Sequence, residues 1–305
     1  MRKFRKRAQS KETNRRRLTT IFVVILALIL CLSLFFRYQI WRSYHTLSIA
    51  EYSLSYETIE QPVSIVFLSD LHENEIDEGN KSLIKAVYDL HPDLILVGGD
   101  MINETTEDFS SLENLLLRLQ QTAPVICALG NKEIDNPLWT KEEKHLKTSG
   151  IPVLDKEYLD IQIGEMALRI GGLYDYTFAL NGENTVMESQ MDPKTYSFLK
   201  DFENTPSFKL MISHRPDSFY FSHDPDYWDV NLVLSGHLHG GQAILPLLGG
   251  IWAPDHGWFP GYCQGLTEVG STALITSAGL GSGPEKLRRF NNPPQFVHLE
   301  LKPEE

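Results

Sequence analysis

The chain has 305 residues, of which 42% are hydrophobic and 22% are charged, a balance typical of a folded globular protein and not of a disordered one. Nine of its 28 Lys and Arg residues fall within residues 1–17, so the rest of the chain carries 19 basic and 39 acidic side chains. An acidic body of this kind argues against a protein that binds nucleic acid through its phosphates.

Residues 18–36 predict the first element, a transmembrane helix. These nineteen residues carry no charge, and at about 1.5 Å per residue they would span roughly 28 Å. Because the basic residues precede this anchor, the positive-inside rule places residues 1–17 in the cytoplasm and the body outside the cell, in a single-pass cell-membrane protein. The alternative is a cleaved signal peptide, although Phe35 to Tyr38 stand where small residues would mark a cleavage site.

Residues 37–61 join the anchor to the body, residues 62–305. Within this tether, Tyr52, Leu54 and Tyr56 alternate with serines, which is the pattern of a half-buried strand. The tether is therefore expected to dock on the body and not to form a free linker.

From residue 63 onward, apolar runs repeatedly end in side chains that can bind metals. The runs and the residues that follow them are VSIVFL (63–68) with Asp70 and His72, LILV (94–97) with Asp100, VICAL (125–129) with Asn131, FKLMI (208–212) with His214, and VNLVL (230–234) with His237 and His239. Amphipathic segments at 79–90 and 109–121 separate the first three runs. This alternation is typical of a parallel sheet, whose ligands gather beyond the carboxyl ends of the strands.

These side chains have the chemistry of a metal centre. Carboxylate, amide oxygen and imidazole form a mixed set that suits divalent Mn, Fe, Zn or similar ions, and none of the seven residues is a cysteine. Each residue alone could be an ordinary turn residue or helix cap, but such residues at five equivalent strand ends are hard to explain in that way. Seven ligands are too many for one ion and suit two ions if one carboxylate bridges them.

The same five stretches resemble the signature blocks of the calcineurin-like metallophosphoesterases, whose order is D-x-H, G-D, G-N-H-[D/E], a single His and G-H-x-H. The blocks stand here as Asp70-Leu71-His72, Gly99-Asp100, Gly130-Asn131-Lys132-Glu133, His214 and Gly236-His237-Leu238-His239. The resemblance covers residues 63–301. GHLHGGQ and the later GLGSGPEKLRRF are similar to a membrane-anchored subgroup, the YaeI-type phosphodiesterases.

The resemblance implies an α/β fold, a four-layer αββα sandwich of two mixed sheets, here preceded by one N-terminal transmembrane helix. Residues 159–163 and 166–170 have the pattern of a hairpin that would supply antiparallel strands.

The resemblance also implies the roles of the site residues. One divalent ion would take Asp70, His72, Asp100 and His239, and the second would take Asp100, Asn131, His214 and His237, with Asp100 shared. A hydroxide between the ions would attack phosphorus, so the implied activity is metal-dependent hydrolysis of a phosphoester, most closely a phosphodiester. Mn, Fe, Zn and Ni all remain open as the metal. Lys132, Asp70 and His214 are expected to take part in the reaction.

Lys132 departs from the family pattern, which has a histidine at this position that is thought to assist the leaving group. A lysine can donate a proton or offset charge, but its ordinary pKa of about 10.4 makes it a poor proton shuttle near neutral pH. The alternative function is a dimetal pseudoenzyme or a sensor of a phosphorylated envelope ligand. By location alone, the anchor favours a lipid-linked or envelope phosphoester as the substrate.

The loop at 247–265 is rich in glycine and carries aromatic residues at 252, 258, 259 and 262. These aromatic residues either form a rim that contacts substrate or the bilayer interface, or pack the loop onto the body. Four further residues could contact substrate, although a surface position is the ordinary expectation for each: His256, Arg215, Arg288 and Arg289.

Overall fold

The computed structural model describes residues 2–282 and 287–304, with side chains from residue 14 onward. The chain divides into two compact units, Met1–Arg42 and Ser43–Glu305. Residues 283–286 of the stretch GLGSGPEKLRRF lie outside the described residues, as do the side chains of most of the basic segment.

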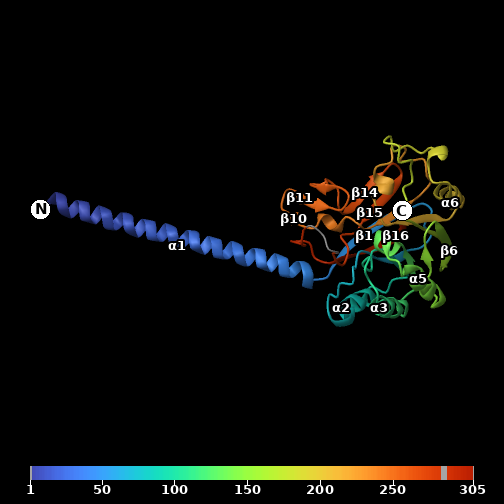
Figure 1. Ribbon diagram of the computed structural model, residues 1–305, viewed down its shortest axis with the longest axis horizontal. Coiled ribbons are helices and arrows are strands. Elements are labelled where there is room, and N and C mark those ends of the chain that lie inside the picture. The colour runs from blue at the N-terminus through green and yellow to red at the C-terminus, as the bar shows by residue number, and fades with distance from the viewer. Residues whose placement is uncertain (1, 283–286, 305) are drawn as a thin grey trace. The chain divides into compact units, whose positions relative to one another are not determined.

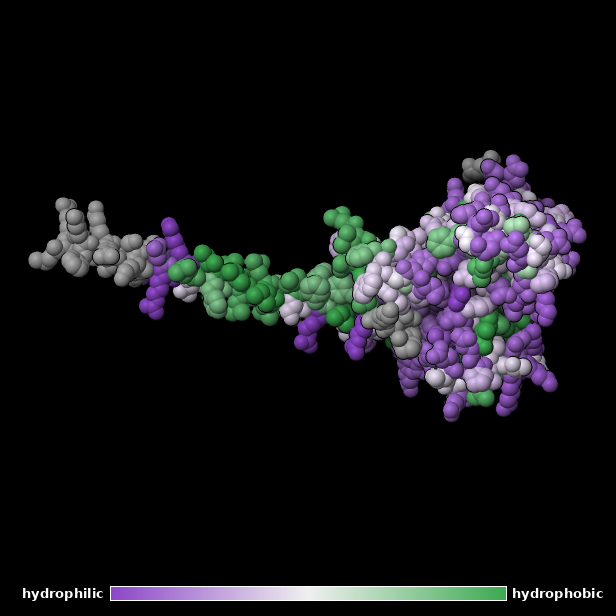
Figure 2. All heavy atoms as spheres, turned by 45° about the horizontal axis from the view of Figure 1, so that its top comes forward, coloured by the Kyte–Doolittle hydropathy of each residue, from purple (hydrophilic) through white to green (hydrophobic). Residues whose placement is uncertain are grey.

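A single unbroken helix, α1 (Arg2–His45), forms the first unit and the first residues of the second. By length and composition, its segment Asn14–His45 is a candidate for a membrane span or a signal sequence. Figure 2 shows the apolar band along this helix. The helix continues past the predicted anchor because residues 37–45 contain no proline or glycine to end it.

Two mixed six-stranded sheets form the centre of the second unit (Figure 1). The first has the order β1-β16-β2-β3-β4-β5, with bounds Ser48–Tyr56, Gln295–Pro303, Val63–Leu68, Leu94–Val97, Val125–Ala128 and Val153–Leu154. The second has the order β14-β15-β9-β8-β7-β6, with bounds Gly265–Val269, Thr272–Thr276, Leu232–Ser235, Phe208–Ser213, Met166–Leu173 and Glu157–Ile163. In both sheets, the strands that precede the predicted ligands are parallel to one another.

The two sheets pack face to face over a core of side chains that point inward from both. Ile65 and Phe67 of the first sheet and Leu210 and Leu234 of the second belong to this core and are fully buried. Val66, which lies between Ile65 and Phe67 in β2, points to the opposite face of the sheet and packs against helices. Such strands are apolar on both faces. Each fully buried leucine or isoleucine contributes about 2 kcal/mol to folding.

Helices cover the two outer faces. The first sheet packs against α2 (Lys81–Asp89), α3 (Ser110–Gln120) and α5 (Trp139–Thr148), of which α2 and α3 lie side by side. The second sheet packs against α6 (Pro193–Glu203) and α7 (Asp217–Tyr220). The order helix, sheet, sheet, helix confirms the four-layer sandwich.

Short elements complete the unit. They are α4 (Asn131–Asp135), the 3-10 helices η1 (Glu78–Asn80), η2 (Glu188–Gln190) and η3 (His239–Gly241), and the hairpin strands β10 (Ile244–Leu245), β11 (Gly249–Gly250), β12 (Trp252–Ala253) and β13 (Gly257–Trp258).

The strands expected from local patterns are present. β6 and β7 pair in antiparallel fashion, which confirms the hairpin expected at 159–170. Tyr52 lies in β1, which pairs along its whole length with β16, so this part of the tether is docked as expected. β2 and β3 have the bounds of the predicted runs, and the other strand ends differ from the predicted ones by one to three residues.

The turn after β3 packs closely against the loop after β4. Gly99 has a φ of +86°, and a Cβ added there would lie 2.2 Å from the backbone nitrogen of Gly130. Gly182 also has a φ of +86°, but nothing lies within 4 Å of its added Cβ.

We therefore expect Gly182→Ala to lower the free energy of unfolding by about 1 kcal/mol through backbone strain alone. Gly99→Ala should lower it by about 3 kcal/mol or more, because its clash is with backbone that cannot rotate away. Urea unfolding of the two purified variants compares them directly. Equal losses would show that the Gly99 turn has room for a side chain.

Candidate metal centre

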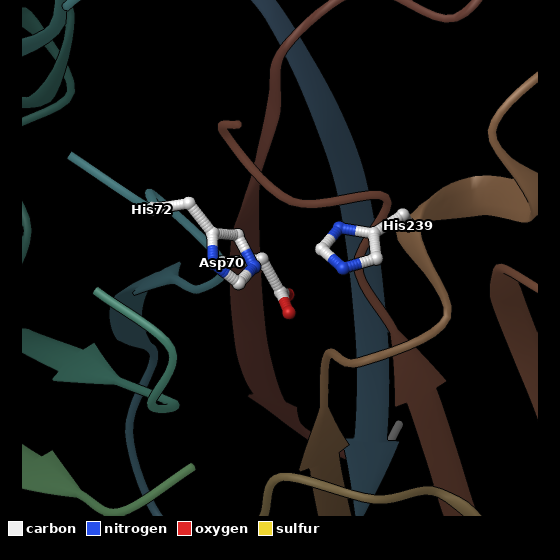
Figure 3. Close-up of side chains that lie close together, drawn as sticks. All are labelled: Asp70, His72 and His239. Carbon is white, nitrogen blue, oxygen red and sulfur yellow. The ribbon is translucent and has the colours of Figure 1, made fainter. Parts of the chain in front are cut away.

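The seven predicted ligands lie together at the carboxyl ends of five parallel strands. They follow β2 (Asp70 and His72), β3 (Asp100), β4 (Asn131, the first residue of α4), β8 (His214) and β9 (His237 and His239). Six of them form two buried trios, Asp70 with His72 and His239, and Asp100 with His214 and His237. Within each trio the candidate ligand atoms all lie within 4.8 Å of one another. Figure 3 shows the first trio, in which the rings of His72 and His239 flank the carboxylate of Asp70.

Asp100 belongs to the second trio and also faces the first. Its Oδ2 atom lies 3.7 Å from Nε2 of His72 and 3.4 Å from Nε2 of His214. One carboxylate therefore faces a histidine of each trio, which is the placement that a bridging ligand requires. Asp70 also approaches the second trio, with its Oδ1 atom 4.0 Å from Nε2 of His214.

Several polar atoms of the site are buried and, among the described residues, have no hydrogen-bond partner. They are Oδ2 of Asp70, Nε2 of His72, Oδ1 of Asn131 and Nε2 of His214. Each buried polar atom without a partner costs about 1–3 kcal/mol, so a cluster of them is typical of a site that a ligand completes. The atoms without a partner are oxygens and imidazole nitrogens, which are suitable ligands for divalent transition metals.

The backbone of the site is strained. Five of the seven residues have positive φ, at 54° for Asp70, 50° for His72, 53° for Asp100, 69° for His237 and 48° for His239. Residues other than glycine adopt this conformation at a cost of about 1 kcal/mol or more, and such residues cluster at functional sites. These five side chains are all members of the two trios, so the strained backbone lies at the candidate site itself.

Hydrogen bonds orient the histidine rings. Nδ1 of His214 donates to the carbonyl oxygen of Gly98 at 2.7 Å, which directs Nε2 into the site. Nε2 of His237 donates to Oδ2 of Asp255 at 2.9 Å, which leaves Nδ1 as the ring atom that can bind an ion. Asp255 lies in the glycine-rich loop, and sequence reasoning gave it no role, because nothing local shows that an exposed turn residue reaches a histidine eighteen positions away.

Glu133 is a second residue whose role was missed. Its buried carboxylate accepts hydrogen bonds from the backbone nitrogens of Gly130 at 2.9 Å, Asp100 at 2.7 Å and Met101 at 2.8 Å. It therefore ties the loop after β3 to the loop after β4. Its acidic position in the G-N-x-[D/E] block was the available signal, but the sequence does not show which backbone groups it meets.

The electrostatics of the buried groups follow from their neighbours. Burial alone would lower the pKa of His214, but the adjacent Asp100 carboxylate outweighs it and raises that pKa to about 9. Burial, followed by repulsion from Asp100, raises the pKa of Glu133 to about 7. Burial lowers the pKa of both His72 and His239. A cation bound between these groups would compete with the proton on His214.

The backbone of Lys132 contacts the metal centre, whereas its side chain reaches a nearby acidic residue. Its backbone nitrogen donates to Oδ1 of Asp100 at 2.8 Å, whereas its ammonium group donates to Oε2 of Glu104 at 3.0 Å. The side chain is 18% exposed, so the charge is partly screened from solvent.

The four further candidates have different surroundings. The guanidinium group of Arg215 lies 3.7 Å from Asp255 and over the ring of Tyr174, close to the site. His256 was expected to be solvent-exposed, but its side chain is only 8% exposed and its Nε2 atom lies 2.7 Å from Oδ1 of Asp217. Arg288 is exposed, in agreement with a surface charge.

Arg289 corrects the expectation of a surface charge. It is 1% exposed, and its guanidinium group donates to the carbonyl oxygens of Ala278 and Gly281. It is therefore a structural residue that satisfies backbone carbonyls next to the metal centre, and those bonds occupy the group that would have met a phosphate.

The aromatic residues of the glycine-rich loop divide between the two expectations. Trp252 is buried, and Tyr262 donates from its hydroxyl to Oγ1 of Thr276 at 2.6 Å, so both pack the loop onto the body. Trp258 and Phe259 are 60% and 62% exposed.

Comparison with known proteins places this geometry in context. The profile of the family Calcineurin-like phosphoesterase matches residues 63–241. The chain is 33% identical to the phosphodiesterase YaeI of Escherichia coli (strain K12), over 79% of this chain and 82% of that protein. It is 30% identical to the uncharacterized metallophosphoesterase YkuE of Bacillus subtilis (strain 168), over 78% of each chain.

Proposed function

The chain belongs to the calcineurin-like phosphoesterase family, and on that premise we propose that it hydrolyses a phosphodiester with two divalent metal ions held at the two trios. Membership makes it a metal-dependent hydrolase of phosphoric esters. The observation that carries the proposal is a pair of buried trios in which the Asp100 carboxylate of the second also faces His72 of the first. The similarity to a protein named as a phosphodiesterase supports a diester over a monoester.

The proposed ligands are divided between two ions. Asp70, His72, Asp100 and His239 would hold the first, and Asp100, Asn131, His214 and His237 would hold the second. When bound, the two ions would lower the pKa of a water between them and neutralise charge on the phosphoryl oxygens. Oxygen and nitrogen ligands leave Mn, Fe, Zn and Ni open as the metal.

The chain's own residues position the candidate ligands. Glu133 holds the backbone nitrogen of Asp100, and the backbone nitrogen of Lys132 donates to the Asp100 carboxylate. The carbonyl oxygen of Gly98 fixes the ring of His214. Groups held in this way need not reorganise during the reaction, which is the main source of catalysis in phosphoryl transfer. We assign Asp70 and His214 to holding the ions, and the Lys132 ammonium to offsetting charge on the leaving oxygen.

A second function is favoured by one observation, the lysine at the family's histidine position. Because the Lys132 ammonium is already bonded to Glu104, its charge is partly offset before any substrate arrives. A pseudoenzyme or sensor that binds metal and a phosphorylated ligand without turnover would have these features.

The two functions differ in turnover. We expect the purified full-length protein in detergent to hydrolyse bis(p-nitrophenyl) phosphate when Mn²⁺ is added. Lys132→His should change the pH profile of that activity, because a histidine titrates near neutral pH and a lysine does not. Lys144→His, which replaces an exposed lysine away from the site, is the matched control. No turnover of the wild type with Mn²⁺, Zn²⁺, Ni²⁺ or Fe²⁺, together with turnover of Lys132→His, would establish the pseudoenzyme.

The ligand assignment predicts metal contents. Asp100→Ala should empty both positions because each ion loses the shared carboxylate. His239→Ala should weaken mainly the first ion and His214→Ala mainly the second, whereas exposed His145→Ala should change neither. Elemental analysis after loading with Mn²⁺ and gel filtration gives the number of ions per chain. Two ions retained by Asp100→Ala would rule out the bridge.

We propose that α1 anchors the enzyme in the cell membrane by a single pass. Residues 1–17 would be the cytoplasmic segment, 18–36 the anchor, 37–61 the tether and 62–305 the extracellular catalytic domain. The support is the charge-free stretch of the helix and the cluster of basic residues on one side of it.

Protease treatment of intact cells tests this topology. We expect added protease to digest the catalytic domain and to leave an N-terminal epitope tag intact, because the membrane shields only the cytoplasmic end. A cytoplasmic marker protein, which should survive, controls for lysis. Protection of the catalytic domain until lysis would reverse the orientation. A mature chain that begins near residue 40 would show a cleaved signal peptide instead.

A further inference from the structure

Two joined hairpins next to the metal centre expose four large apolar side chains. The turn between β10 and β11 carries Leu247 and Leu248, which are 106% and 63% exposed. β13 ends with Trp258, which is followed by Phe259, and these are 60% and 62% exposed. The two hairpins are joined because the backbone nitrogen of Phe259 donates to the carbonyl oxygen of Ile251 at 2.8 Å. We call these four residues the apolar tip.

The base of the tip is bonded to the segment 289–292. Ile244 donates from its backbone nitrogen to the carbonyl oxygen of Phe290 at 2.9 Å, and Asn292 donates from its side chain to the carbonyl oxygen of Gln242 at 3.1 Å. The same segment also bonds the first residues of the second unit. The backbone nitrogen of Asn292 donates to Oγ of Ser43 at 3.0 Å.

This attachment joins the base of the tip to Ser43, the first residue of the second unit. The charge-free stretch ends at Phe36, and Ser43 follows seven residues later in the same helix. Seven helical residues cover about 10 Å, and the headgroup layer beyond the hydrocarbon is roughly 5–8 Å thick. Ser43, and with it the base of the tip, would therefore stand at the outer edge of the headgroup layer.

The chemistry of the tip fits that layer. Residues 242–254 contain no charged side chain, so the β10–β11 hairpin can enter an apolar medium without carrying a charge into it. Tryptophan and phenylalanine favour the boundary between headgroups and hydrocarbon. An isolated exposed leucine needs no explanation, but the tip exposes four large apolar side chains on one joined pair of hairpins.

The tip is also continuous with the metal centre. The segment that forms it begins at the candidate ligand His239, in η3, and includes Asp255, whose carboxylate accepts the hydrogen bond from His237. Asn292 connects the two regions as well, since its side chain donates to the carbonyl oxygen of His239 at 2.8 Å. A membrane contact at the tip would thus lie beside the reacting centre.

We propose that the apolar tip inserts into the outer boundary of the bilayer and that the enzyme acts on phosphodiesters of membrane lipids at that surface. The insertion rests on the tip and on the proposed anchor, and the choice of substrate rests in addition on the proposed hydrolase function. An amphiphilic phosphodiester held in the bilayer would present its headgroup to the metal centre, and its acyl chains would stay in the membrane.

Quenching by nitroxide lipids tests the insertion. The full-length chain carries Leu248→Cys, labelled with the fluorophore NBD, in a Cys31→Ser background, and is reconstituted in nanodiscs of phosphatidylcholine and phosphatidylglycerol. Leu180→Cys is the matched control, because Leu180 is a 71% exposed leucine on the loop before η2. Cys127 and Cys263 are buried, and the background protein reports any label that they take up.

We expect nitroxide near the headgroup to quench the label at position 248 at least about twofold more than the label at position 180. Equal quenching at both positions would overturn the insertion. Blue-shifted emission at position 248 that increases with protein concentration, without quenching by nitroxide lipids, would show that a second copy of the chain covers the tip, and would overturn it too.

Two substrates, one soluble and one held in a bilayer, distinguish the effect of the membrane surface from the hydrolysis itself. The double variant Leu247→Ser, Leu248→Ser should hydrolyse soluble bis(p-nitrophenyl) phosphate like the wild type. On a diacylglycerol phosphate with a nitrophenyl headgroup in the nanodiscs, it should be about tenfold slower. Leu180→Ser is the control for both substrates. Equal losses on the two substrates would overturn action at the surface, whereas no turnover of either by any variant would refute the hydrolase function and leave the quenching result to decide the insertion.

Discussion

The position of the Asp100 carboxylate is the constraint on which the rest of the site depends. It faces a histidine of each trio, and it is held by the Lys132 backbone on one oxygen and by the strained turn after β3. Glu133 fixes the same turn through three backbone nitrogens. A carboxylate that serves two sites can tolerate little movement, which explains why the residues around it have buried hydrogen bonds and glycines without room for a Cβ.

Each trio draws on both sheets, so the metal centre depends on how the sheets pack. Asp70 and His72 follow a strand of the first sheet, whereas His239 follows a strand of the second. The second trio is divided in the same way, with Asp100 from the first sheet and two histidines from the second. The apolar core between the sheets therefore sets the separation of the ligands, because a close-packed interior resists small displacements. Stability and function are linked through this core.

The proposed membrane arrangement has a physical reason in the charge of the chain. The body is strongly acidic, so an anionic lipid surface would repel it. An apolar contact such as the tip can hold an acidic domain at a bilayer without the help of a basic patch. The proposed anchor would keep the domain at high local concentration near the surface, and the tip would then need to supply only its orientation.

The sequence by itself determined the layers of the fold and the set of candidate ligands. Continuous apolar runs that end in Asp, Asn or His predicted buried parallel strands with polar side chains at their carboxyl ends. The order of the motifs gave the resemblance to the family, and that resemblance implied the layers. Only the tertiary structure showed that Asp255 reaches His237, that Glu133 holds three backbone nitrogens, and that Arg289 is buried instead of exposed. It also showed that Trp252 is buried while Trp258 is exposed within one loop. These features depend on contacts between residues far apart in the chain. Local pattern reports the period and polarity of a segment, but the partner that a side chain meets is decided by how the two sheets and their loops come together in space.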